Sequence, residues 1–275
     1  MALSGAGTQE NPFLITTIEE LRAQVTDTNS YYKLSNSLDT IGTQWESEWG
    51  SVTVKCKELD FNFKLIKNIK ASSYFLNDDV ANNAITIKNL LMENSLYSST
   101  SIFNLLNYVS PRVLILQHFS CSATFIGTTA SAFLCASQGI NVDDVSINLN
   151  NMGSIIKIIN STQDIKNVSV LLNGVGTFSS GIVAGGSNEL LENIYILGKF
   201  NFNYSNGTSF SLFSGSNNYA KFCYCEAEIT GIGTNPYSFK LFNTTTTALQ
   251  ASCFFSGSLL GQFSNVYTPI TNCYY

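Results

Sequence analysis

The side chains that could carry out chemistry are a single histidine, His118, and several pairs of acidic residues. Two carboxylates at the right separation can hydrolyse a glycosidic bond, one acting as acid and the other as base or nucleophile. The histidine could only work with a partner that the fold brings close. The acidic pairs are Asp78 and Asp79, Asp143 and Asp144, Glu46 and Glu48, and Glu226 and Glu228.

The ordinary interpretation of most of these residues is structural. The two Asp pairs lie in polar stretches, which favours solvated turns. His118 ends an apolar run that begins after Pro111, which is typical of a corner residue, and no Ser/His/Asp triad can be assembled around it. We therefore expect no enzymatic activity, no catalytic residue, no metal and no cofactor.

Glu46 and Glu48 differ from the other acidic pairs because Trp45 and Trp49 flank them. Aromatic rings beside carboxylates can bind sugars by stacking and hydrogen bonding. The same pattern also fits a loop that packs over the N-terminal end of the molecule. The sequence leaves both interpretations open.

The composition narrows the class of protein. The 275 residues contain 12% charged side chains, about half of the usual share of roughly 25%. A net charge of −5 with 14 Lys and Arg argues against a nucleic-acid partner, which needs a basic face. No run approaches the roughly 20 apolar residues of a membrane span. Residues 1–5 are neither basic nor strongly apolar, so we expect no secretory signal.

The seven cysteines are odd in number and do not cluster as metal ligands do. Cys223 and Cys225 are two residues apart and therefore share one face of a strand. We predict small, buried, reduced side chains, with Cys225, Cys253 and Cys273 stacked in one interior column.

The first residues contain the only clear helical pattern. Thr17 and Glu20 have the spacing of a capping box, and the apolar residues that follow have helical spacing. We predict one short helix over 17–26, between strands at 13–16 and 31–34. This segment, residues 1–51, would cap the N-terminal end of the fold.

From residue 52 onward, short β-rich runs recur between Asn, Ser and Gly turns, at irregular spacings that centre on one coil of a parallel β-helix. We predict an all-β, single-stranded parallel β-helix over 52–275. Its two inner columns are mainly apolar. They are Ile147, Val170, Ile196, Cys225, Cys253 and Cys273, and Leu149, Leu172, Gly198, Ala227, Phe255 and Tyr275.

The same alternation predicts two outward columns. They are Ser146, Ser169, Tyr195, Tyr224, Ser252 and Asn272, and Asn148, Leu171, Leu197, Glu226, Phe254 and Tyr274. The second half of this face is rich in apolar and aromatic side chains, which a solvated monomer rarely exposes. A partner protein could cover the face, or sugars could stack on it, unless the alignment is out of register. Its candidate binding residues are Leu171, Tyr195, Leu197, Tyr224, Glu226, Phe254 and Tyr274.

The N-terminal segment resembles the opening of many right-handed parallel β-helix proteins of the pectin-lyase-like family. The resemblance lies in Gly5-x-Gly7-Thr8-x-x-Asn11-Pro12-Phe13, in the capping-box segment up to Leu21, and in Tyr31-Tyr32-Lys33-Leu34. The closing Ile270-Thr-Asn-Cys-Tyr-Tyr275 resembles coil ends of repeat-bearing adhesins. The family includes bacterial adhesins and bacteriophage structural proteins, and the resemblance implies a right-handed solenoid.

With no secretory signal expected, the resemblance favours a non-enzymatic bacteriophage virion protein, assembled in the host cytoplasm. A head decoration or fibre protein and a tail appendage are the candidate roles. The expected partners are further copies of the chain, in a trimer, other virion proteins and a host-surface polysaccharide. Two alternatives remain: a carbohydrate depolymerase or lyase on the same scaffold, and a bacterial surface adhesin module.

Overall fold

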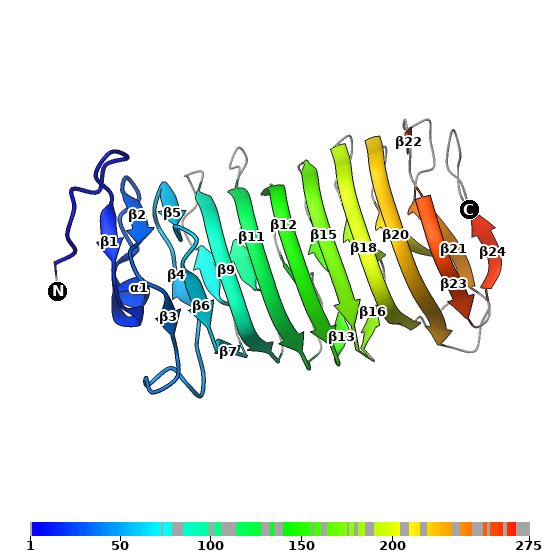
Figure 1. Cartoon of the computed structure of the whole chain (residues 1–275), viewed down its shortest axis with the longest axis horizontal. Helices are drawn as coiled ribbons and strands as arrows, with labels where there is room; N and C mark the ends of the chain where they lie inside the picture. Colours follow the sequence, from blue (N-terminus) through cyan, green and yellow to red (C-terminus); the bar gives the residue numbers. More distant parts are fainter. Residues whose placement is uncertain are drawn as a thin grey trace.

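The computed structural model is a parallel β-solenoid with one short helix, which confirms the predicted fold class (Figure 1). Seen in Figure 1, the long front strands run downward while the chain advances from left to right, so the coil is right-handed. The structure describes residues 2–72, 74–78, 85–98, 102–105, 114–127, 133–134, 140–155, 157–160, 164–174, 176–178, 181–184, 190–203, 209–214, 219–232, 237–243, 250–251, 254–260 and 263–267.

The N-terminal segment folds as its sequence predicts. Helix α1 spans Ile18–Gln24, and Thr17 is its N-cap. The Thr17 hydroxyl accepts a hydrogen bond from the Glu20 backbone at 3.2 Å, and the Glu20 carboxylate accepts one from the Thr17 backbone at 3.2 Å. Ile18, Leu21 and Val25 are buried, so the helix covers the end of the apolar interior.

Parallel pairing begins before residue 52. Strand β1 (Phe13–Ile15) pairs with β2 (Tyr31–Leu34), and β2 pairs with β5 (Glu58–Asp60). The main sheet therefore crosses the predicted division at residue 52 without a break. The other short strands of this region are β3 (Leu38–Asp39), β4 (Val52–Thr53), β6 (Leu65–Lys67) and β7 (Lys70–Ala71).

Seven longer strands lie side by side along the front of the molecule, each paired in parallel with the next (Figure 1). Their backbones carry the candidate site. They are β9 (Thr86–Tyr97), β11 (Leu114–Phe125), β12 (Ile140–Asn151), β15 (Ile165–Asn173), β18 (Leu190–Asn203), β20 (Tyr219–Ile232) and β23 (Phe254–Leu260).

Shorter strands complete each coil behind and below the front strands. One further sheet has the order β10 (Phe103–Leu105), β8 (Leu76–Asp78), β4. Another has the order β14 (Ile159–Asn160), β17 (Gly181–Ala184), β19 (Ser209–Ser214), β21 (Tyr237–Asn243), β24 (Phe263–Tyr267). Strands β13 (Ser154–Ile155), β16 (Thr177–Phe178) and β22 (Gln250–Ala251) join the main sheet.

The interior is one continuous apolar core, in which aligned residues of successive coils stack on each other. Ile147 lies beside Val170, Val170 beside Ile196, and Ile196 beside Cys225, as predicted. All four side chains are buried. Stacking at about 4.8 Å per coil is what fills the interior, since no single coil can bury its own apolar face.

Six of the seven front strands, all but β23, contain a residue other than glycine with left-handed backbone. We call this column the left-handed corner. Its members are Asn89, His118, Asp144, Asn167, Asn193 and Phe222, with φ between 52° and 57°. Asn and Asp tolerate this conformation better than other residues with a side chain. The corner is also bonded from coil to coil, because the Asn193 side-chain amide donates to that of Asn167 at 2.9 Å.

Beside the corner runs a row whose charges alternate in sign, interrupted by the uncharged Gln117. We call it the charged row, and its members are Asp60, Lys88, Gln117, Asp143, Lys166, Glu192 and Lys221. Lys166 shows the consequence. Its pKa is raised first by the hydrogen bond to Asp164 and then by the negative charges of Asp164, Glu192 and Asp143. Charges therefore stack in this solenoid when each faces the opposite sign.

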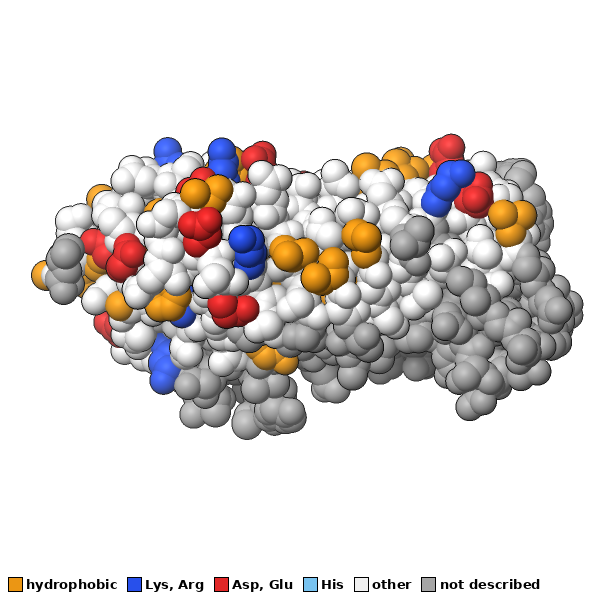
Figure 2. Space-filling view, turned by 90° about the horizontal axis from the view of Figure 1, so that it is seen from below, with side chains coloured by type: hydrophobic (Ala, Val, Ile, Leu, Met, Phe, Trp, Pro, Cys, Tyr) orange, Lys and Arg blue, Asp and Glu red, His pale blue; other side chains and the backbone are white. Residues whose placement is uncertain are grey.

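The surface away from these rows is mainly uncharged. Figure 2 shows one long side of the molecule, where polar uncharged groups and backbone predominate among the described residues and the charged side chains gather in a few places. In the part of the chain that the structure describes, no helix is long and apolar enough to cross a membrane.

The left-handed corner yields a stability prediction. Replacing Asn193 by Val should lower the free energy of unfolding by about 1–2 kcal/mol, because a β-branched residue fits poorly at φ 54° and cannot bond to Asn167. Urea unfolding followed by circular dichroism measures the change. The matched control is Asn150→Val, at an exposed strand position without positive φ, which should change stability by less than half as much. Equal effects at both positions would contradict the role given to the corner.

Candidate functional site

The candidate site is the outward surface of β11, β12, β15, β18, β20 and β23 beyond the left-handed corner. We call it the front face. Two rows of residues, each in register from strand to strand, form it. The serine–aromatic row consists of Ser120, Ser146, Ser169, Tyr195, Tyr224 and Phe254. The leucine row consists of Ser122, Asn148, Leu171, Leu197, Glu226 and Ser256.

The register of the last coil differs from the prediction. The sequence pattern places Phe254 beside Glu226, whereas the structure places it beside Tyr224. The backbone of Phe254 belongs to β23, while Tyr274 lies outside the described residues, as do Ser252 and Asn272. By backbone register, Phe254 follows directly on Tyr195 and Tyr224.

Four described apolar or aromatic side chains of the front face reach solvent to different extents. Tyr195 is 51% exposed and Leu171 is 39% exposed, while Leu197 and Tyr224 are half-buried. The rings of Tyr195 and Tyr224 lie 5.7 Å apart between centroids, at an interplanar angle of 49°. Two neighbouring coils therefore present a pair of packed aromatic rings with one side free.

Glu226 is oriented by a hydrogen bond from its neighbour. The Tyr224 hydroxyl donates to the Glu226 carboxylate at 2.9 Å. This hydrogen bond is the main reason why the pKa of Tyr224 is raised, and slight desolvation and the negative charge of Glu226 add to it. The tyrosine therefore stays protonated at neutral pH and keeps the carboxylate beside the aromatic pair.

Next to the front face, the strands bend at a row without large side chains. We call this row, Gly198, Ala227 and Gly257, the glycine bend. Gly198 and Gly257 have φ of 127° and 135°, and a Cβ atom at either would lie 1.9 Å from a carbonyl oxygen of the preceding coil. Only glycine fits that approach. The sequence placed Gly198 in an inner column, and the bend explains why an apolar side chain is missing there.

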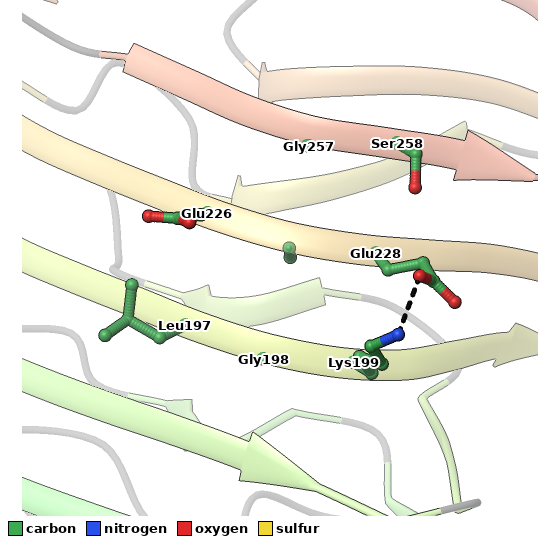
Figure 3. Close-up of a pocket in the computed structure, with 8 residues that line it drawn as sticks. Leu197, Gly198, Lys199, Glu226, Glu228, Gly257 and Ser258 are labelled. Atoms are coloured by element: carbon green, nitrogen blue, oxygen red, sulfur yellow. Dashed lines mark hydrogen bonds and ion pairs between the residues drawn. The ribbon is translucent and has the colours of Figure 1, made fainter.

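A shallow hollow of about 570 Å³ lies over the glycine bend (Figure 3). Leu197 and Glu226 line it on the side of the front face, and Lys199, Glu228 and Ser258 on the other. The Lys199 ammonium group forms an ion pair with Glu228 at 2.9 Å, as the predicted register requires. The hollow thus offers carboxylates, an ammonium group and a hydroxyl group beside exposed aromatic rings.

The remaining acidic pairs and the histidine lie elsewhere. His118 Nδ1 lies 2.6 Å from an Asp144 carboxylate oxygen, and both residues belong to the left-handed corner. His118 lies within β11 rather than at a strand end. Asp143 accepts a hydrogen bond from the Asn167 amide at 2.7 Å. Asp79 and the side chain of Asp78 lie outside the described residues.

The tryptophan loop packs against the N-terminal cap. Trp49 is buried against Phe75, with centroids 5.4 Å apart, and its indole nitrogen donates to the Phe75 carbonyl at 3.0 Å. The Arg22 guanidinium group lies 3.6 Å above the centroid of Trp45. These contacts favour the loop interpretation, since a sugar would need Trp49 exposed.

The two carboxylates of this loop hold its backbone. Glu46 accepts a hydrogen bond from the Gly42 amide at 2.8 Å, and Glu48 accepts one from the Ser72 amide at 3.0 Å. Partial burial alone would raise the pKa of Glu48, but hydrogen bonds from Ser72 and Gly50 outweigh it and lower the pKa.

The predicted column of stacked cysteines does not continue past Cys225. Cys225 lies beside Phe255 rather than Cys253, so the predicted stack of Cys225, Cys253 and Cys273 is wrong at its first step. Cys253 and Cys273 lie outside the described residues. Cys56, Cys121, Cys223 and Cys225 are buried, and Cys121 and Cys225 are free thiols. No group of three metal-ligating side chains occurs among the residues that the structure describes.

The sequence did not reveal two features of the site. The glycine bend was hidden because Gly198 looked like a weak member of an inner column. The row of serines was also predicted too short. The predicted outward column began at Ser146, whereas the structure extends the row by one strand to Ser120. One sequence signal could have revealed the glycine bend and the row of serines: a small residue, glycine or serine, that recurs at the same position of successive β-rich runs.

Comparisons with known proteins add no relative. No protein-family model matches the chain, no curated protein matches it, and no solved structure matches it.

The buried thiols yield a chemical prediction. Burial raises the pKa values of Cys121 and Cys225, and the thiolate is the reactive form. A maleimide reagent at neutral pH should therefore leave Cys56, Cys121, Cys223 and Cys225 unmodified in the folded protein, as peptide mass mapping would show. The same reagent should modify all four in urea. Modification of Cys121 or Cys225 in the folded state would contradict the interior position assigned to them.

Proposed function

We propose that this chain is a non-enzymatic structural protein of a bacteriophage particle, in which the front face binds protein. The observation that carries the proposal is the exposed aromatic and leucine side chains of Tyr195, Leu171 and their neighbours on neighbouring coils. Contiguous apolar surface of this kind usually marks a site of protein contact. The resemblance of residues 5–34 to the opening of phage β-helix proteins supports the particle as the setting.

The engagement of the charged groups supports a structural role. Glu228 is paired with Lys199, Glu226 accepts from Tyr224, and His118 contacts Asp144. Each of these acids already has a partner that stabilises its charge or fixes its orientation.

Particle composition tests the proposal. Particles of the phage that encodes the chain, purified by density-gradient centrifugation, should contain the protein at a constant ratio to the main capsid protein when analysed by quantitative mass spectrometry. In a phage carrying Tyr195→Ser together with Leu171→Ser, that ratio should fall at least several-fold, because both changes remove apolar contact area. The matched control Ser47→Ala, in an exposed loop near the N-terminal cap, should leave the ratio unchanged. Finding the chain only in the soluble lysate would refute the proposal.

A second candidate function is binding of a host-surface glycan, with or without cleavage. The hollow over the glycine bend favours it, because two carboxylates, a lysine and a serine lie beside the aromatic pair Tyr195 and Tyr224. Sugar hydroxyl groups bond to carboxylates, and aromatic rings stack on the apolar faces of sugars. Cleavage would need Glu226 and Glu228 to act together.

Incubation with capsule and cell-wall glycans of the host separates these outcomes. Under the structural proposal, no reducing ends and no unsaturated uronates should appear over a day at neutral pH. A glycan-binding role without cleavage should show as retention on immobilised glycan that Tyr224→Ala weakens about tenfold or more, a loss of roughly 1.4 kcal/mol. Release of reducing ends that Glu228→Gln abolishes would replace the structural proposal by the enzymatic alternative.

A further inference from the structure

The front face has a pattern that a second copy of the chain would match. Along the serine–aromatic row, three small residues on β11, β12 and β15 are followed by three aromatic residues on β18, β20 and β23. The change from small to large falls between Ser169 and Tyr195, which are paired on neighbouring strands. If such a row is turned end to end and laid against itself, each small residue lies opposite a large one.

We infer that two copies of this chain bind through their front faces, related by a twofold axis that runs parallel to the strands and passes between β15 and β18. This rotation keeps each row facing itself and reverses the order of the coils. Ser169 then faces Tyr195 of the second copy, and Ser146 faces Tyr224 of the second copy. The rings of Tyr195 and Tyr224 each meet a serine, so the large side chains of one copy fit against the small ones of the other. The contact is isologous, as in most soluble dimers.

The leucine row obeys the same operation. Leu171 faces Leu197 of the second copy next to the axis, and both are apolar. Farther from the axis, Asn148 faces Glu226 of the second copy, so that an amide N–H group can donate to the carboxylate. The interface would thus have an apolar centre and polar ends, which is the usual anatomy of a protein contact.

The charged row, at the rim of the front face, is also complementary to itself under this rotation. Reversing the coil order opposes Lys166 to Glu192 of the second copy and Asp143 to Lys221 of the second copy. Every charge in this stretch meets the opposite sign. An alternating row with an even number of charges is self-complementary under this rotation, and complementary charges fix the register of association.

A threefold axis along the solenoid would not bring small residues opposite large ones. It would place the same coil of each copy at the same level, so that aromatic residues meet aromatic residues at one end and serines meet serines at the other. The rings would crowd while the serines left unfilled space, and unfilled space forfeits packing energy. The structure therefore favours a twofold contact over the trimer that the resemblance implies. The inference rests on the proposed function only in that protein covers the front face.

Sedimentation equilibrium on the purified full chain is the first test. The single-chain mass is 30.1 kDa, and the dimer should have twice this mass at micromolar to submillimolar concentrations. A monomer at the highest concentration measured, or a trimer, would overturn the inference.

An exchange of residues tests the pairing itself. Ser169→Tyr places two tyrosines opposite each other and should weaken the dimer by about tenfold or more, and Tyr195→Ser should weaken it by a similar factor through lost contact. The double variant Ser169→Tyr/Tyr195→Ser restores a large residue opposite a small one and should recover most of the wild-type affinity. Such recovery is the signature of direct pairing between the two positions.

Controls make the exchange decisive. Ser47→Tyr adds the same side chain to an exposed loop outside the front face and should leave the dimer unchanged. Circular dichroism and the melting temperature show that each variant is folded. If the double variant associates more weakly than both single variants, the twofold pairing is wrong. Because particle composition is measured separately, a failed exchange with normal incorporation would overturn this dimer and leave the proposed function standing.

Discussion

Every part of this molecule depends on one distance, the spacing of about 4.8 Å between a residue and its counterpart one coil away. At that spacing the nearest neighbour of a side chain is the residue at the same position of the next coil, rather than a residue nearby in sequence. The core, the left-handed corner, the charged row and the front face are all built from columns of this kind. What a residue contributes is decided by what stands above and below it in its column.

This constraint explains the unusual composition. Uncharged polar residues stack on their own kind without repulsion, so Asn, Ser and Thr replace much of the usual charge. The charged row shows that the avoidance of charge is not absolute. Lys166 stands between Asp143 and Glu192. Its pKa is raised first by the hydrogen bond to Asp164, and the negative charges of Asp164, Glu192 and Asp143 raise it further. The constraint is therefore on the order of charges along a column, and the front face applies the same logic to size, with serines in one half and aromatic residues in the other.

The sequence predicted much of the fold because alternation and turn residues are local signals. The capping box at Thr17, the inner columns from Ile147 to Cys225, and the pairing of Lys199 with Glu228 were all correct. The error in the last coil has a simple cause. A slip of two residues leaves every side chain on the same face, so alternation cannot distinguish Phe254 beside Glu226 from Phe254 beside Tyr224. The glycine bend was missed because a left-handed glycine depends on the carbonyl oxygen of another coil, which no local pattern records.

The charged row also limits how this protein could change in length over evolution. Loss of the coil that contains Lys166 would bring Asp143 beside Glu192, and its duplication would stack two lysines. Loss of two successive coils, with Lys166 and Glu192 together, would instead bring Asp143 beside Lys221 and keep the signs alternating. Homologues of different length should therefore differ by an even number of coils in this region. In this stretch of the solenoid, coils should be gained or lost in pairs, one coil with an acidic residue and one with a basic residue in the charged row.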